Sequence, residues 1–288
     1  MSSIKEEDLT NIIPKDGPTI EETIKYLEKY IEDFIVIKMG GSVLSNKDFF
    51  NNLIQDIAVL KKLGLLIFLI HGGGSKISKK LDDLNIKSNF INGLRVTDDK
   101  IIDIVEDVLV QFNKEITDTL NNYSCSAKEI TSKKNNIIIV KPENETLGFV
   151  GKPIKINTNI LTEIIKANEV PVIASLGLDK NDQTFNINAD SVAGAIAKEL
   201  KARRLLILSD VEGVLDKSKK LIPEINSDQA KKMIFGGVVS GGMIPKVENC
   251  LDVAKNGVKG VCIIDGRKKH SILFELLSDK GSGTLIRE

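Results

Sequence analysis

Two lysines and one aspartate, far apart in this chain of 288 residues, stand where charged side chains could handle an anion. Lys38 ends an apolar run typical of a strand, where a lysine is out of place unless a cleft lies there. Lys246 follows a glycine-rich segment near the start of a predicted helix, from which a flexible ammonium group can reach phosphate oxygens. Asp190 opens another predicted helix, and a carboxylate between two lysines would offset their repulsion. The three side chains together indicate a phosphate-handling site.

Glycine-rich junctions follow the first two predicted strands. The first contains Gly40 and Gly41, and the second contains Gly72, Gly73 and Gly74. Missing Cβ atoms let backbone N–H groups approach an anion, and the N-terminus of the following helix adds partial positive charge. Tight turns alone would explain one such junction, but two on consecutive strands favour an anion site.

Other interpretations of these residues stay open at this point. Lys246 could be a solvated surface residue, and either Asn188 or Asp190 could serve only as a helix cap. His71, just before the second glycine junction, is interpreted as a structural hydrogen-bonding residue rather than a catalyst. The chain contains no G-x-x-x-x-G-K-[ST], no G-x-G-x-x-G and no G-x-S-x-G. Their absence argues against a P-loop, a dinucleotide-binding fold and a serine hydrolase.

Composition excludes several classes of partner. The 40 Lys and Arg residues balance the 40 Asp and Glu residues, so no basic surface for nucleic acid or an acidic membrane face is predicted. The longest apolar stretch, residues 63–70, is too short to cross a bilayer. Three widely spaced cysteines favour a reducing, cytoplasmic setting. The chain's two histidines are too few for most metal sites, and we expect no protein metal site.

Short apolar runs alternate with amphipathic segments from residue 34 onward, which predicts an α/β fold with parallel strands joined by helical crossovers. We expect a three-layer α/β/α sandwich around a mainly parallel open sheet that two lobes share. The predicted strands span residues 34–37, 65–70, 137–140, 170–174, 205–208 and 261–264, with a hairpin around 148–155. The predicted helices span residues 48–62, 76–84, 98–120, 159–167, 190–200, 228–235, 244–255 and 268–277.

The N-terminal segment is predicted to be polar and unpatterned up to about Asp16. A helix then runs from Thr19 to Phe34, started by a capping box of Thr19 and Glu22. Its apolar positions form a narrow stripe suited to docking on another helix or subunit. The pattern is equally compatible with a helix packed on its own domain.

The motifs taken together resemble the amino-acid kinase family, and within it the members that phosphorylate N-acetyl-L-glutamate in arginine biosynthesis. The resemblance covers residues 34 to 288, and Asn-Gly-Leu-Arg-Val-Thr-Asp is its most discriminating motif. The motifs are Ile37-Lys38-Met-Gly40-Gly41, His71-Gly72-Gly73-Gly74, Asn92-Gly93-Leu94-Arg95-Val96-Thr97-Asp98, Asn186-Ile-Asn188-Ala-Asp190, Leu208-Ser209-Asp210-Val-Glu-Gly213 and Gly241-Gly242-Met243-Ile-Pro-Lys246.

The resemblance implies a role for each motif residue. Lys38 and Lys246 would stabilise charge on the transferring phosphoryl group, and Asp190 would organise both lysines. The substrate would be held by Gly73, Gly74, Arg95 and Asn186, and the amides of Gly41 and Gly73 would also hold the γ-phosphate. The cofactor would be ATP, with Mg²⁺ bound to its phosphates. The phosphates and nucleotide would contact Gly40, Gly41, Gly72, Ser209, Asp210, Gly213 and Met243. Phosphoryl transfer then depends on positioning and charge stabilisation.

The resemblance extends to regulation and assembly. The helix at residues 19–34 is similar to the extra helix that interlaces dimers into hexamers in arginine-inhibited members. Glu275 and Gly281 stand in a tail similar to their arginine-binding end, although Cys262 and Asp265 depart from that pattern and Thr146 replaces an acidic residue in the hairpin. We therefore expect arginine inhibition and a homo-oligomer, either a dimer or a hexamer built as a trimer of dimers.

The implied domain organisation is an N-terminal extension over residues 1–33 and one kinase domain over 34–288. Within it, residues 34–200 form a substrate-binding and dimerisation lobe, and residues 201–288 form a nucleotide-binding lobe. Two alternatives stay open. One is a kinase of N-acetyl-aminoadipate or a carrier-bound homologue, which one methylene separates from the first substrate. The other is a nucleotide-sensing module without turnover.

Overall fold

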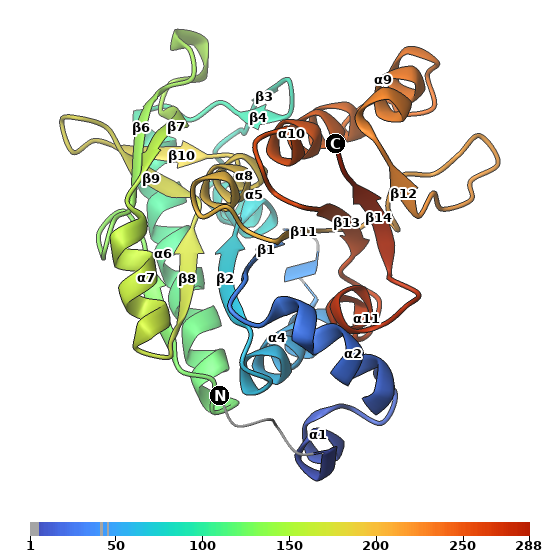
Figure 1. The fold of residues 1–288 in the computed structure, drawn as a ribbon. Helices are drawn as coiled ribbons and strands as arrows, with labels where there is room; N and C mark the ends of the chain where they lie inside the picture. Colours follow the sequence, from blue (N-terminus) through green and yellow to red (C-terminus); the bar gives the residue numbers. More distant parts are fainter. Residues whose placement is uncertain (1–5, 41–42, 45) are drawn as a thin grey trace.

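A mainly parallel sheet forms the centre of the molecule. The structure is a computed structural model that describes residues 6–40, 43–44 and 46–288. Eight strands pair in the order β12-β14-β13-β11-β1-β2-β8-β5, and only β13 and β14 run antiparallel to each other (Figure 1). Their bounds are β1 (Phe34–Met39), β2 (Leu66–His71), β5 (Ala127–Ile130), β8 (Val170–Ala174), β11 (Arg204–Ser209), β12 (Glu224–Ile225), β13 (Val261–Asp265) and β14 (Gly283–Ile286). The predicted continuous sheet is therefore confirmed.

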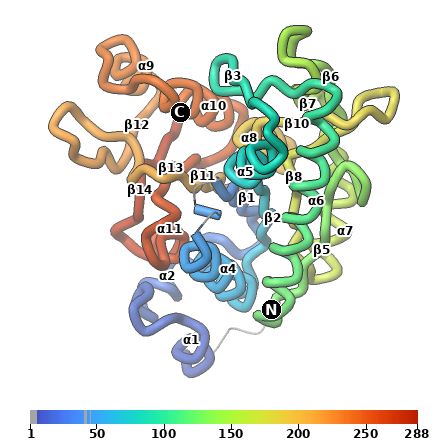
Figure 2. The backbone as a smooth tube through the Cα atoms, turned by 180° about the vertical axis from the view of Figure 1, so that it is seen from behind, coloured from blue at the N-terminus to red at the C-terminus, as the bar shows by residue number. Residues whose placement is uncertain are grey.

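Helices cover both faces of this sheet, because the apolar residues of each strand alternate between the faces. Ile35 and Ile37 of β1 belong to the core under α2, α4, α6 and α11, whereas Val36 belongs to the core under α7, α8 and α10. Figure 2 shows the long helix α6 running past β5 and β8. The helix bounds are α2 (Ile20–Tyr30), α4 (Lys47–Lys62), α6 (Asp99–Asn122), α7 (Thr158–Lys166), α8 (Ala189–Glu199), α10 (Met243–Lys255) and α11 (Ser271–Leu277). The three-layer α/β/α prediction is confirmed.

A small closed barrel lies beyond the carboxyl ends of β2 and β8 (Figure 1). It consists of β6 (Ile138–Pro142), β7 (Val150–Ile156), β9 (Leu176–Leu178) and β10 (Thr184–Ile187). A 3₁₀ turn, η1 (Glu145–Leu147), sits in the predicted hairpin between β6 and β7. Strands β9 and β10 were not predicted as strands, because runs of three and four residues carry little periodicity. They matter here because β10 carries Asn186.

The N-terminal segment is more ordered than its composition indicates. The prediction that residues up to Asp16 are unpatterned is wrong, because α1 (Glu6–Ile12) forms and buries Leu9 to 1% exposure. The capping box of Thr19 and Glu22 is confirmed at the start of α2. This helix ends at Tyr30 rather than Phe34, since Phe34 already begins β1.

Two further helices, α5 (Gly74–Asp83) and α9 (Ser227–Phe235), and one hairpin of the strands β3 (Phe90–Ile91) and β4 (Leu94–Arg95) complete the described fold. The other helix boundaries shift by one or two residues from prediction, except at α11. Residue Lys268 was predicted to start that helix, but His270 adopts a left-handed conformation (φ 57°) and α11 begins at Ser271. Within the described ranges, no helix is long and apolar enough to cross a membrane.

His270, which has a left-handed backbone conformation, links the N-terminal segment to the body of the protein through its side chain. Its Nδ1 lies 2.6 Å from Asp56 Oδ1 on α4, and its Nε2 lies 3.1 Å from Asp16 Oδ1. Lys269 Nζ also contacts Asp16 at 2.7 Å. The hydrogen bond with Asp56 raises the pKa of His270 above its ordinary value of 6.5, against the lowering effect of burial.

We expect the stabilisation from His270 to weaken in alkaline solution. A folded-state pKa above the unfolded value means that the stabilisation is complete below about pH 6.5 and is lost as pH rises through the folded-state pKa. His270→Gln should therefore lower the free energy of unfolding by about 2 kcal/mol at pH 6 and by clearly less at pH 9. Urea unfolding of both proteins at the two pH values measures this, and an equal loss at both would contradict it.

Candidate active site

The structure brings Lys38, Asp190 and Lys246 together at the carboxyl end of the sheet. Lys38 Nζ lies 2.8 Å from Asp190 Oδ1, and Lys246 Nζ lies 2.7 Å from Asp190 Oδ2. The three side chains are largely buried, with exposed fractions of 11%, 17% and 17% in sequence order. Each carboxylate oxygen is therefore occupied by one ammonium group, and we call these three residues the lysine–aspartate cluster.

Local folding explains why the aspartate is available to both lysines. Asn188 is the N-cap of α8, and its side-chain oxygen accepts the backbone N–H groups of Asp190 and Ser191 at 2.9 and 3.1 Å. The capping role open in the sequence thus falls to Asn188. Its cap leaves the Asp190 carboxylate free to face Lys38 and Lys246.

Charge in the lysine–aspartate cluster favours binding of an anion. Burial by itself would raise the pKa of Asp190, but Lys38 and Lys246 overcome this effect and lower the pKa to about 2. The carboxylate is therefore ionised at neutral pH. Two ammonium groups and one carboxylate leave one unit of positive charge in a site largely shielded from water, where charge interactions are strong.

Helix packing holds Lys246 against Asp190. Lys246 lies in the first turn of α10, which packs on α8. One turn later, Asn249 Nδ2 donates to the backbone oxygen of Asp190 at 3.1 Å. Gly194 on α8 permits this approach, since a Cβ there would lie 2.8 Å from Val253 of α10. The cluster therefore joins a strand from residues 34–200 to a helix from residues 201–288.

The second glycine junction lies beside the cluster. Gly72, Gly73 and Gly74 line a cavity of about 220 Å³ together with Lys38, Asp190, Arg95 and Asn186. A larger cavity of about 830 Å³ adjoins it and is lined by Asp190, Lys246 and residues of the Gly241-Gly242 turn. The structure thus groups the predicted substrate residues in one cavity around the cluster.

The first glycine junction is required by close backbone packing. A Cβ at Gly40 would lie only 2.6 Å from the backbone oxygen of Leu208, so any larger residue would force β1 and β11 apart. The prediction for Gly41 lies outside the described residues.

Arg95 enters the cavity with its guanidinium held by neutral acceptors. Its Nη2 donates to the Gly74 backbone oxygen at 3.0 Å and to Ser78 Oγ at 2.9 Å, and its Nη1 donates to Ser88 Oγ. The ring of Phe90 lies 4.7 Å from the guanidinium carbon. Arginine has five N–H donors, so two remain for an anionic ligand.

A hairpin that the sequence analysis missed carries Arg95 into place. Strands β3 and β4 pair antiparallel around Asn92 (φ 51°) and Gly93 (φ 80°). This Asn-Gly pair is the usual signal of a two-residue hairpin and could have been used to predict it.

Asn186 shares a hydrogen-bond chain with the backbone of Arg95. Asn186 Nδ2 donates to Thr97 Oγ1 at 3.3 Å, and Thr97 Oγ1 donates to the Arg95 backbone oxygen at 2.9 Å. Strand β10 and the end of β4 therefore position the two side chains relative to each other.

Four of the seven residues predicted for the phosphates and nucleotide of ATP come from the end of β11, the segment after it and the start of α10. Ser209 ends β11 and its hydroxyl donates to Asp210 Oδ1 at 3.4 Å. Gly213 adopts φ 142° and leaves no room for a Cβ beside Thr284. Met243 begins α10. None of the four lines the two cavities described above. Met243 nevertheless shares the first turn of α10 with Lys246, and Ser209 lies on the strand that pairs with β1.

Glu275 of α11 and Gly281, which lies just before β14, do lie together. Glu275 Oε2 accepts the Ser282 backbone N–H at 2.8 Å, and a Cβ at Gly281 would lie 3.3 Å from that oxygen. Helix α2 is tied to the same segment through Asp279, which Lys25 and the Tyr26 hydroxyl contact at 2.5 and 2.6 Å.

Comparisons with known proteins show the family to which the chain belongs. Residues 33–265 match the sequence model of the amino acid kinase family. The chain is 68% identical to the acetylglutamate kinase of Pelagibacter ubique (strain HTCC1062), and the match covers all of both chains. It is 42% identical to the acetylglutamate kinase of Nitrobacter hamburgensis (strain DSM 10229 / NCIMB 13809 / X14), over 98% of this chain and 99% of the relative.

Solved structures share the fold. The smu.665 protein from Streptococcus mutans UA159 is 31% identical and superposes with a TM-score of 0.76, covering 89% of this chain and 99% of that one. An N-acetylglutamate synthase from Neisseria gonorrhoeae, 21% identical, superposes with a TM-score of 0.85 over 93% of this chain and 62% of its own. From the matched residues and the near full-length relatives, the chain belongs to the amino acid kinase family.

Proposed function

We propose that this protein transfers the γ-phosphoryl group of ATP to the side-chain carboxylate of N-acetyl-L-glutamate, forming N-acetyl-L-glutamyl 5-phosphate and ADP in arginine biosynthesis. The named relatives supply the substrate, and the lysine–aspartate cluster beside the Arg95 cavity is the observation that carries the chemistry. Lys38 and Asp190 line this cavity and Lys246 lines the adjoining one, so the cluster carries a net positive charge where the two cavities meet. Arg95 lines the same cavity as Lys38, and two of its N–H donors have no acceptor among the described residues.

The reaction needs no general base. A carboxylate oxygen of the substrate is already ionised at neutral pH, attacks the γ-phosphorus and forms the new P–O bond as the bond to the β–γ bridging oxygen breaks. ADP leaves, and no proton moves. Lys38 and Lys246 stabilise the charge on the phosphoryl oxygens, and Asp190 fixes both ammonium groups.

We assign the ligands to the residues of the same site. Arg95 binds the α-carboxylate, Asn186 and Gly74 bind the remaining polar groups of the acetylamino acid, and the Gly73 amide faces the γ-phosphate. The nucleotide is assigned to the phosphate-side glycines and to the edge of β11. These residues are Gly40, Gly41, Gly72, Ser209, Asp210, Gly213 and Met243.

Magnesium is assigned to the phosphates of ATP rather than to protein ligands. Both oxygens of Asp190 are engaged by lysines. Among the described residues no group of three His, Cys, Asp or Glu side chains could hold a metal ion. When bound with ATP, the ion neutralises phosphate charge.

A turnover assay tests the proposed activity. We expect ADP release from MgATP that depends on N-acetyl-L-glutamate. A higher kcat/KM for N-acetyl-aminoadipate or a carrier-bound homologue would replace the substrate assignment, since one methylene changes selectivity by only about 1–3 kcal/mol. Nucleotide binding without turnover on any of these acids would favour a sensor of the same fold.

Arg95→Lys should mainly raise the KM for N-acetyl-L-glutamate, by about tenfold or more. Lysine keeps the charge but loses the planar fork that Gly74, Ser78 and Ser88 orient. Initial rates over a range of substrate concentrations measure the effect. An unchanged KM would remove Arg95 from the substrate site.

Arginine inhibition is proposed for the segment that contains Glu275 and Gly281. Glu275 supplies a carboxylate suited to a guanidinium group, and α2 is tied to the same segment through Asp279. Rates measured across millimolar arginine should fall for the wild type and stay high for Glu275→Gln. A flat curve for the wild type would dismiss this regulation.

Assembly and organisation are proposed on the same basis. Ile24 and Ile31 of the N-terminal extension are 40% and 50% exposed, which fits an oligomerisation helix in residues 1–33 and a dimer or hexamer. Light scattering on Ile24→Asp would test this assembly, because the molar mass in solution should fall.

The substrate lobe is assigned to residues 34–200 and the nucleotide lobe to 201–288. Three free buried cysteines fit a cytoplasmic setting.

A further inference from the structure

We propose that His71 is a positioning residue that directs the backbone N–H of Gly73 toward the transferring phosphoryl group. The inference rests on the proposed kinase activity. It adds a role for a residue that this reaction does not use as an acid or a base. His71 ends β2 and immediately precedes the glycine junction beside the lysine–aspartate cluster.

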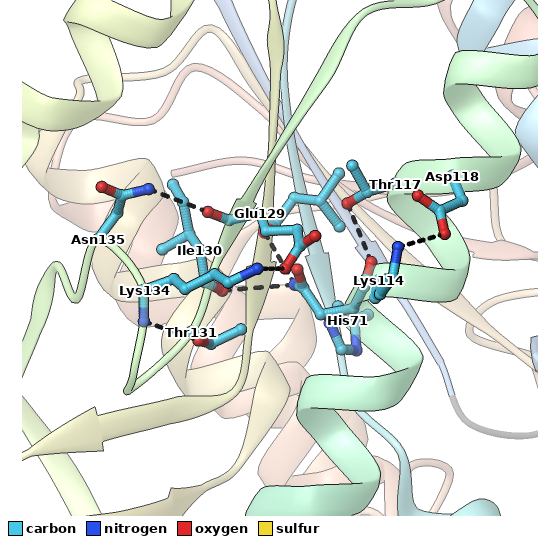
Figure 3. Close-up of polar contacts among 11 residues, drawn as sticks. His71, Lys114, Thr117, Asp118, Glu129, Ile130, Thr131, Lys134 and Asn135 are labelled. Atoms are coloured by element: carbon cyan, nitrogen blue, oxygen red, sulfur yellow. Dashed lines mark hydrogen bonds and ion pairs between the residues drawn. The ribbon is translucent and has the colours of Figure 1, made fainter.

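The imidazole of His71 is fully buried beside α6. Its exposed fraction is 0%, and its ring meets the Phe112 ring edge-on with centroids 5.3 Å apart. Asn113 Nδ2 on the same helix lies 2.9 Å from His71 Nε2. In Figure 3 His71 lies among residues of α6 and β5, including Thr117 and Ile130. The ring is held from the side opposite to the phosphate site.

The partners of Asn113 fix the orientation of its amide. Its Nδ2 donates to the backbone oxygen of Val172 at 2.9 Å and lies 3.4 Å from that of Ile130. Carbonyl oxygens only accept hydrogen bonds, so the amide nitrogen must face them. The same nitrogen then donates its second hydrogen to His71 Nε2, which must accept.

The tautomer of His71 follows from this orientation. With Nε2 as acceptor, the hydrogen of the neutral ring sits on Nδ1. His71 Nδ1 lies 3.1 Å from the backbone oxygen of Gly72 and donates to it. Burial supports the neutral state, because it lowers the pKa of His71 to about 4. The Nδ1–H donor is therefore retained throughout the neutral pH range.

This hydrogen bond sets the plane of the Gly72–Gly73 peptide. In a trans peptide the carbonyl and the following N–H point in opposite directions, and no cis peptide occurs in the described chain. The Gly72 carbonyl turns back toward His71, on the side of α6. The Gly73 N–H is thereby directed to the other side, where Lys38 and Asp190 of the cluster lie.

Glycine makes this positioning necessary. A Cβ at Gly73 would lie 2.6 Å from Leu109 of α6, and a Cβ at Gly72 would lie 3.3 Å from Ala189 of α8. The junction therefore needs glycines, whose peptides rotate more freely than those of other residues. The hydrogen bond from His71 restricts that rotation, as preorganised N–H donors in catalytic sites require.

Two amide substitutions test the inference, because they place a donor at different points. The side-chain nitrogen of His71→Asn falls near the position of Nδ1 and can still donate to Gly72, whereas that of His71→Gln falls near Nε2 and can reach only Asn113. We expect Asn to keep kcat within about threefold of wild type. Gln should lower kcat by about 10- to 100-fold, with the KM for N-acetyl-L-glutamate little changed.

A purely structural role would give the opposite order, since Gln fills the buried volume better and keeps the contact with Asn113. A kcat for Gln equal to or above that for Asn would overturn the inference. Thr117→Val is the matched control, because Thr117 is 4% exposed and bonds only the Asn113 backbone; its kcat should equal that of wild type. Wild-type turnover with N-acetyl-L-glutamate, measured alongside, tests the proposed function separately.

Imidazole ¹⁵N NMR of the wild type keeps the inference testable if a variant does not fold. The chain has two histidines, and His270→Gln removes the signals of the other one. We expect His71 to show a protonated Nδ1 and an unprotonated Nε2, unchanged from pH 8 to pH 6. A protonated Nε2 would overturn the inference.

Discussion

Replacing Lys38 or Lys246 with alanine is expected to lower kcat by about 10²–10³-fold. In the proposed mechanism each lysine supplies one of the two positive charges that stabilise the phosphoryl group, and the two Nζ atoms are held 2.8 and 2.7 Å from Asp190. Removal of a single preorganised charge stabiliser has an effect of this size. Initial rates of ADP release at saturating substrates give kcat for each variant.

Lys198→Ala is the matched control for these two variants. Lys198 on α8 pairs with Asp252 on α10 at 2.6 Å, so this ion pair joins the same two helices outside the lysine–aspartate cluster. Its removal should leave kcat within about twofold, since an exposed ion pair contributes only about 0–1 kcal/mol to stability. Wild-type turnover in Lys38→Ala or Lys246→Ala would contradict their proposed roles.

Asp190→Asn is expected to lower both kcat and the stability of the protein. The neutral amide leaves two ammonium groups close together in a largely buried site without their shared counter-charge. Loss of one partner from a buried ion pair costs about 3–5 kcal/mol, and we expect a loss near the lower figure together with a fall in kcat of about 100-fold or more. Urea unfolding and the ADP-release assay measure the two effects.

A double variant separates these two effects. Adding Lys246→Met to Asp190→Asn removes one of the repelling charges, so part of the lost stability should return while kcat stays low.

The stability of the wild type should depend on pH through the same carboxylate. Because the pKa of Asp190 is lowered to about 2, its contribution to stability is present above pH 3.8 and is lost as pH falls toward 2. Near-normal kcat in Asp190→Asn would refute its role.

Periodicity sufficed to predict the long helices and five of the eight strands of the sheet. It did not predict β5, β12 and β14, which are only two to four residues long. Helix α6 and strand β8 were placed within two residues of their bounds. Helix α1 was missed, because Leu9 becomes an apolar contact only when the segment folds back onto the body of the protein. The start of α11 was misplaced because the left-handed His270 is held by Asp56 and Asp16, more than 200 residues earlier.

The site was predictable in its residue types and less so in its contacts. Each member of the lysine–aspartate cluster stood at the end of a strand or the start of a helix, and such ends meet at one edge of a parallel sheet. The sequence contained no signal that Ser78 and Ser88 would orient Arg95, since serine is common on exposed helices and loops. The tautomer of His71 was equally hidden, because it depends on carbonyls of Ile130 and Val172 from two other strands.

The position of β1 in the sheet limits how the chain can fold during its synthesis. Strand β1 lies between β2 and β11, so one of its edges pairs only with residues 204–207. Until that part of the chain has left the ribosome, this edge keeps unpaired backbone groups, which favour aggregation. Residues 34–200 and residues 201–288 are therefore not independent folding units, and nascent chains that stop near residue 200 would depend on chaperones.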